Sequence, residues 1–101
     1  MVTNENKPGY ELLIGALLSL ETKEECNKFL EDICTINEIN SISQRLEVAR
    51  MLRKNMTYIE ISDATGASTA TISRVNRSLN YGNSSIDTIF KKLNTDIEKE
   101  K

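Results

Sequence analysis

Histidine and tryptophan are absent from the 101 residues of the chain, and proline, glycine and cysteine are scarce. Without histidine, the commonest general base and metal ligand is missing, and Cys26 and Cys34 lie too far apart for a CxxC site. Four glycines and one proline are too few for the frequent turns of a β-sandwich or β-barrel. We therefore expect an all-α protein that is not an enzyme and binds no metal.

Long apolar runs are also lacking. The apolar stretch at 12–20 is much shorter than the ~20 residues that span a bilayer, and no basic flank or cleavage site marks it as a leader. We expect a cytoplasmic protein with reduced cysteines and no membrane partner. Residues 10–20 are nevertheless apolar on most sides of a helix, which one short chain can hardly bury. This segment is interpreted either as an interchain helix or as a core helix.

The net charge of −2 hides an uneven distribution along the chain. Residues 1–43 carry three lysines against eight acidic side chains, a net charge of −5. Residues 44–78 carry six basic side chains against three acidic ones, a net charge of +3, and the remainder is neutral. The acidic total argues against nucleic acid as a partner, whereas the basic segment favours contact with its phosphates.

Apolar spacing and helix caps predict about six helices in a single domain at 10–101, preceded by a flexible arm at 1–9. Thr22 with Glu25, and Thr35 with Glu38, have the spacing of capping boxes. The second of these boxes opens a helix of about 19 residues that ends near 54–55. Serines at 84 and 85 are expected to cap the last helix.

Residues 57–78 have the spacing of a helix-turn-helix. Thr57 and Glu60 form a third capping box, and Gly66 provides the positive φ that ends the short helix. Ser68 caps a second helix at once. Four apolar residues are placed to hold the two helices together: Ile61, Ala67, Ile72 and Val75. An ordinary helical corner with a polar face has the same local pattern and stays open as the alternative.

Short and basic side chains face outward on the second helix of this motif. Short residues at the start of a recognition helix let the backbone approach base edges in the major groove, and basic residues contact phosphates. The predicted contacts with double-stranded DNA are Ser68, Thr69, Ala70, Thr71, Ser73, Arg74, Arg77, Arg53 and Lys54. For Arg53 and Lys54, a solvated helix end that complements the helix dipole is the competing interpretation.

Residues 44–57 and 66–79 resemble the Trp repressor family, and more narrowly its YerC/YecD group. The resemblance implies an intertwined homodimer, whose two recognition helices enter successive major grooves of a palindromic operator. It therefore implies a transcriptional repressor. The alternative is a helical protein-interaction module that retains the fold without binding DNA or tryptophan.

The resemblance also implies a corepressor site. The family's ligand-binding positions fall on Arg45, Arg74, Thr35, Thr71 and Ser78, and the two arginines suit a carboxylate. However, Val75 stands where the Trp repressor has a glycine beside the indole, and a valine occupies part of that space. We expect no tryptophan cofactor, and a small carboxylate is the remaining alternative.

Overall fold

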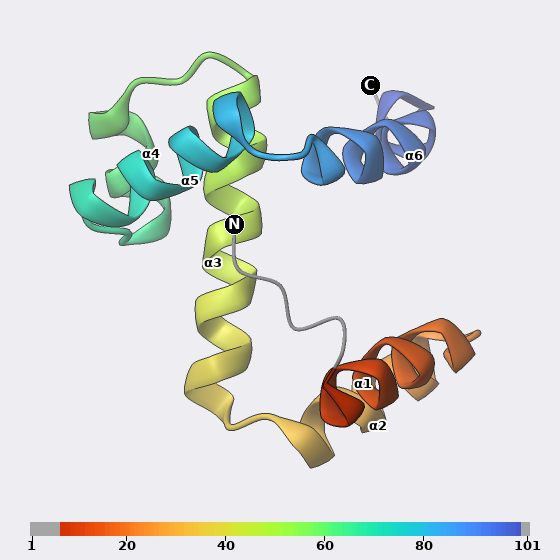
Figure 1. The fold of residues 1–101 in the computed structure, drawn as a ribbon. Coiled ribbons are helices and arrows are strands. Elements are labelled where there is room, and N and C mark those ends of the chain that lie inside the picture. The colour runs from red at the N-terminus through yellow and green to blue at the C-terminus, as the bar shows by residue number, and fades with distance from the viewer. Residues whose placement is uncertain (1–6, 100–101) are drawn as a thin grey trace. The chain divides into compact units, whose positions relative to one another are not determined.

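The structure is a computed structural model that describes residues 7–99, with side chains up to Leu93, as six helices and no strand within that range (Figure 1). The helices are α1 (Pro8–Ser19), α2 (Lys23–Ile33), α3 (Ile36–Arg53), α4 (Tyr58–Thr65), α5 (Thr69–Tyr81) and α6 (Ser85–Lys99). The predicted all-α class is confirmed. Of the predicted flexible arm, residues 1–6 lie outside the described range, and residues 8 and 9 are helical instead. Pro8 starts α1 because its fixed φ suits the first helical position.

The chain divides into two compact units, Met1–Ile39 and Asn40–Lys101, with the boundary in the first turn of α3. The single domain predicted at 10–101 stays a prediction. No described residue of the first unit is buried. On α1, Leu12 and Leu18 are 76% and 80% exposed. None of the described helices is long and apolar enough to cross a membrane.

The helix starts follow the predicted caps closely. Thr35 Oγ1 accepts from the Glu38 N–H at 3.1 Å, and Glu38 Oε1 accepts from the Thr35 N–H at 2.8 Å, which completes a capping box. Thr22 accepts from the Glu25 N–H at 3.0 Å, but the Glu25 carboxylate reaches the N–H of Glu21 rather than that of Thr22. The cap at Thr22 therefore differs from the predicted box, because the Glu25 carboxylate bonds the residue before the N-cap.

The α3 helix ends in a left-handed residue, Asn55, with φ of 63°. The Met56 N–H donates to the Met51 carbonyl at 3.2 Å, and the Asn55 N–H donates to the Leu52 carbonyl at 3.0 Å. This pair of hydrogen bonds is a Schellman motif, which satisfies the last carbonyl groups and turns the chain into α4. The predicted end near 54–55 is confirmed.

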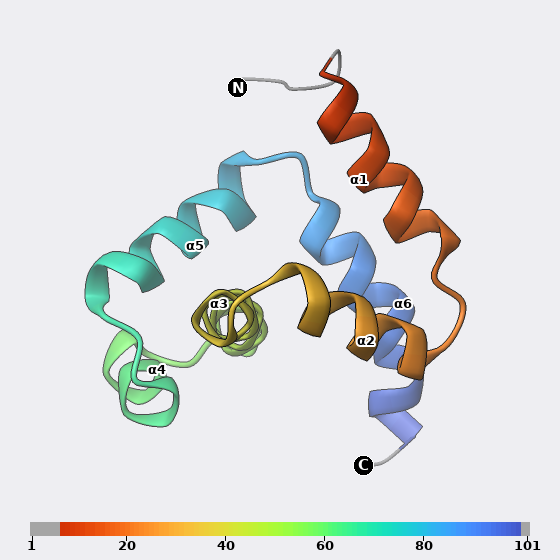
Figure 2. The ribbon, with the colours of Figure 1, turned by 90° about the horizontal axis from the view of Figure 1, so that it is seen from below.

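The core of the second unit lies where α3 meets the α4–α5 pair. Val48, Ile61 and Ile72 are fully buried, Ala67 is nearly so, and Val75 packs against them half-buried. Figures 1 and 2 show α4 and α5 side by side, as their contacts require. The apolar residues predicted to hold the helix-turn-helix together therefore do so.

The last helix begins differently from the prediction. Ser85 donates its N–H to the Asn83 side chain at 3.3 Å, and Ser84 has a positive φ of 66°. The cap is therefore an Asx turn made by Asn83, whose side chain bonds the backbone two residues on. Ser84 does precede the helix at the predicted cap position, and its carbonyl accepts from the Thr88 N–H at 3.1 Å, but the side-chain bond comes from Asn83 instead of a serine.

Candidate nucleic-acid interface

The turn between α4 and α5 is held by local hydrogen bonds. Gly66 adopts φ of 76° and closes α4 by donating its N–H to the Ser62 carbonyl at 2.8 Å. Thr65 Oγ1 donates to the Ile61 carbonyl and accepts from the Ala67 N–H at 3.1 Å. From α3, Gln44 donates to the Thr65 carbonyl at 3.1 Å. The turn is thereby fixed against the long helix, by a residue whose part in it sequence reasoning missed.

The second helix of the motif, α5, starts at a capped N-terminus. Ser68 Oγ accepts from the Thr71 N–H at 3.1 Å, as predicted. Most predicted contacts on this helix and its cap are exposed, whereas Thr71 is half-buried and turns toward α3. The exposed residues are Ser68, Thr69, Ala70, Ser73, Arg74 and Arg77. The capped end of α5 therefore presents short polar side chains and free backbone N–H groups to solvent.

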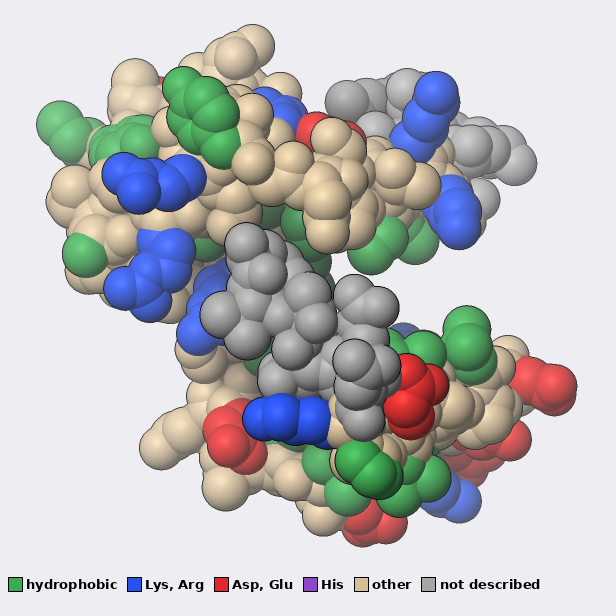
Figure 3. All heavy atoms as spheres, viewed as in Figure 1, with side chains coloured by type: hydrophobic (Ala, Val, Ile, Leu, Met, Phe, Trp, Pro, Cys, Tyr) green, Lys and Arg blue, Asp and Glu red, His purple; other side chains and the backbone are tan. Residues whose placement is uncertain are grey.

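Basic side chains accompany this surface. Lys54, Arg74 and Arg77 are exposed, and none of them takes part in the ion pairs found among the described residues. Figure 3 shows Lys and Arg side chains over the α4–α5 region and a gathering of Asp and Glu side chains over α1 and α2. Unpaired cations at a capped helix surface can neutralise phosphates.

Arg53, one of the predicted phosphate contacts, also takes part in an ion pair within the fold. Its Nε and Nη2 donate to the two carboxylate oxygens of Asp87 on α6, at 2.8 and 2.9 Å, and Nη2 also donates to the Leu79 carbonyl at 3.0 Å. The hydrogen bonds from Arg53 lower the pKa of Asp87 and raise that of Arg53. These bonds use Nε and Nη2, whereas Nη1 makes none of the described hydrogen bonds, so Arg53 as a DNA contact stays a prediction.

A pocket of about 480 Å³ opens between α3, α5 and the start of α6. Its apolar wall is formed by Ile42, Leu46, Ala49, Val75, Leu79 and Ile86. Its polar groups are Ser41, Gln44, Arg45, Thr71, Arg74 and Ser78. This volume and this mixture of apolar and convergent polar groups are typical of small-molecule sites.

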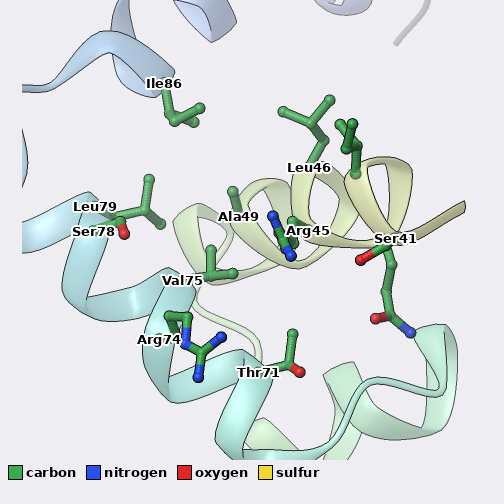
Figure 4. A pocket seen from close by; sticks show the side chains of 12 residues that line it. Ser41, Arg45, Leu46, Ala49, Thr71, Arg74, Val75, Ser78, Leu79 and Ile86 are labelled. Atoms are coloured by element: carbon green, nitrogen blue, oxygen red, sulfur yellow. The ribbon is translucent and has the colours of Figure 1, made fainter. Parts of the chain in front are cut away.

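The pocket brings together four of the five residues in the implied ligand set: Arg45, Arg74, Thr71 and Ser78. The fifth, Thr35, lies in the first unit and caps α3. Figure 4 shows Val75 pointing from α5 toward α3, within the pocket wall. The valine thus takes up part of the volume between the two helices.

A capped outward helix that follows a tight, glycine-closed turn defines a helix-turn-helix protein. The sequence matches the Trp repressor protein family over residues 9–94. The chain belongs to the Trp repressor family, and this membership indicates a DNA-binding regulator. The predicted resemblance is therefore confirmed.

Individual relatives agree with this assignment. The chain is 65% identical over 71 residues to the uncharacterised protein YerC of Bacillus subtilis, covering 70% of this chain and 68% of YerC. A crystal structure of a TrpR-like protein from Eubacterium eligens has a TM-score of 0.85 and 57% identity, covering 91% of this chain and 96% of that one. A crystal structure described as a Trp repressor candidate from Staphylococcus aureus has a TM-score of 0.82 and 50% identity. The match covers 85% of this chain and 86% of that one.

Proposed function

We propose that the protein is a sequence-specific transcriptional repressor that binds a palindromic operator as a homodimer. The observation that carries the proposal is the exposed N-terminal half of α5, where short side chains lie beside unpaired Arg74 and Arg77. In this arrangement the exposed Ser68, Thr69, Ala70 and Ser73 approach base edges, with the half-buried Thr71 behind them on the side of α3. The two arginines and Lys54 contact phosphates.

Binding to a random duplex library tests this function directly. We expect the protein to enrich an inverted repeat whose half-sites lie about one helical turn apart, with affinity that falls steeply between 50 and 200 mM salt. Arg77→Gln should weaken binding on all sequences and lower the magnitude of the salt slope by about 1. Lys28→Gln on α2 removes the same charge and should leave binding unchanged. If the protein binds no duplex even at low salt, the proposed function is wrong and the alternative of a helical protein-interaction module is favoured.

We further propose that the pocket between α3 and α5 takes a small carboxylate, with Arg45 and Arg74 pairing with it. The support is that both arginines, Thr71 and Ser78 line one cavity, and that Val75 narrows it. Tryptophan is then too large, because the Val75 side chain occupies the space that an indole needs.

Calorimetric titration with individual amino acids and small organic acids, without DNA, tests the pocket. We expect a short aliphatic acid to bind and Arg45→Gln to abolish its binding. Val75→Gly should gain tryptophan binding that the natural protein lacks. Tryptophan binding by the unchanged protein would contradict the argument from Val75.

A further inference from the structure

Tyr81 continues the outward stripe of α5 one turn beyond the residues predicted from sequence. Counting from Ala70, the steps to Arg74, Arg77 and Tyr81 are four, three and four residues, which keep all four side chains on one face of a helix. The contacts predicted from sequence end at Arg77, and Tyr81 is the last residue of the helix. Extending the same periodicity by one turn places Tyr81 on this face as well.

The environment of Tyr81 is unusual for an aromatic residue. Its side chain is 85% exposed, and among the described hydrogen bonds its hydroxyl has no partner. A tyrosine ring offers a large apolar surface and one polar tip, a combination that is common where a partner is bound. Neither its ring nor its hydroxyl is used within the described part of the chain.

The position of Tyr81 is fixed by the end of the helix. Gly82 donates its N–H to the Ser78 carbonyl at 2.9 Å, and a Cβ at residue 82 would overlap that same carbonyl oxygen. Only glycine fits this close approach. The helix therefore ends directly after Tyr81, which keeps the backbone of residue 81 in the register of the outward face.

The length of α5 places Tyr81 relative to DNA. Eleven residues separate Ala70 from Tyr81, a rise of about 16 Å along the axis. The major groove is about 12 Å wide, so a helix that enters by its N-terminal turn has its last turn over the bordering strand. Tyr81 then faces sugar and phosphate rather than base edges.

From this register, exposure and length we infer that Tyr81 is a DNA-backbone contact, with its hydroxyl donating to a phosphate oxygen and its ring covering the adjacent sugar. The inference rests on the proposed DNA-binding function. Phosphate contacts of this kind set register and affinity and carry no sequence information. A tyrosine also brings no charge, so its contribution is separable from that of Arg77 one turn earlier.

Tyr81→Phe tests the hydroxyl on the duplex that the natural protein selects from a random library. We expect binding to weaken by about threefold to tenfold, as for one exposed hydrogen bond to a charged acceptor, on selected and scrambled duplexes alike. The salt slope should stay unchanged, whereas Arg77→Gln lowers it by about 1. Asn27→Ala, which removes an exposed polar side chain on α2, is the control and should bind as the natural protein does.

The outcomes separate the contact from the function on which it rests. If the natural protein binds no duplex, the proposed function itself fails. If it binds while Tyr81→Phe and Tyr81→Ala bind equally well, the Tyr81 contact is overturned and the function stands. A Tyr81→Ala variant that changes oligomeric state but not DNA affinity assigns the ring to a protein interface instead, which also overturns the contact. Thermal melting of each variant identifies any loss caused by unfolding.

Discussion

The guanidinium of Arg53 donates to both carboxylate oxygens of Asp87, and it also donates to the Leu79 carbonyl. One arginine thereby joins the ends of α3 and α5 to the first turn of α6. Such a two-pronged pair has a planar geometry that lysine cannot reproduce. Arg53, which the sequence predicts as a phosphate contact, is therefore also a residue that fixes the start of α6.

Asp87→Asn should lower the melting temperature modestly at neutral pH, because the pair is partly exposed to solvent. The pKa of Asp87 is lowered in the folded protein, so its contribution is fully present above the ordinary carboxyl pKa of about 4. It is lost as the pH falls through the lower, folded value. The melting difference between the natural protein and the variant should consequently shrink toward pH 3.

Glu47→Gln supplies the control for this measurement. It breaks the exposed pair with Arg50 inside α3, three residues along the same helix, and leaves α6 attached. Its effect on melting should be smaller at pH 7. An Asp87→Asn difference that stays constant from pH 7 to pH 3 would mean that the ion pair is not its source.

Elements are predictable from sequence where their determinants are local. The capping box of α4, the left-handed Gly66 and the Ser68 cap each involve residues two to four apart, so pattern alone finds them. The ties that orient the elements are not local. Gln44 and the Thr65 carbonyl are 21 residues apart, and Arg53 and Asp87 are 34 apart. No periodicity encodes such pairs, which is why the ion pair between Arg53 and Asp87 was not predicted.

Gly66→Ala should destabilise the helix-turn-helix by about 1–2 kcal/mol, the cost of a left-handed backbone for a residue with a Cβ. Space is not the reason, since a Cβ at this position meets nothing within 4 Å. Gly66→Asn should lower the unfolding free energy by less than Gly66→Ala does, because asparagine tolerates the left-handed conformation. Chemical denaturation of the three proteins measures the order, and equal losses for alanine and asparagine would contradict it.

Replacing a buried and an exposed isoleucine of the motif by alanine should show how much stability comes from burial. Ile72 on α5 is fully buried, whereas Ile59 on α4 is 75% exposed. Ile72→Ala should cost about 2–5 kcal/mol of unfolding free energy through lost burial and a cavity. Ile59→Ala should stay within about 0.5 kcal/mol of the natural protein in the same denaturant titration. Similar losses at both sites would place the core elsewhere.

At the scale of the whole molecule, the buried residues and the basic segment both lie in the second unit, and the acidic residues predominate in the first. The second unit contains every buried residue among those described and the whole of the basic segment. The first unit is acidic, and its apolar side chains have no buried position. Exposed leucines in such number are costly in water, so a second chain covering α1 is the arrangement that the proposed homodimer provides.

The double variant Leu12→Glu and Leu18→Glu should therefore separate the dimer into single chains. Charges placed on the apolar surface of α1 cannot be buried without a partner for each, so association becomes unfavourable. Sedimentation should give the mass of two chains for the natural protein and of one chain for the variant. Affinity for the inverted repeat should fall at least about tenfold, because two linked half-site contacts become independent.

Asn27→Glu with Asn37→Glu adds the same charge at exposed polar positions and should keep both the dimer and its DNA binding. A natural protein that sediments as one chain, or a leucine variant that still sediments as two, would remove α1 from the interface.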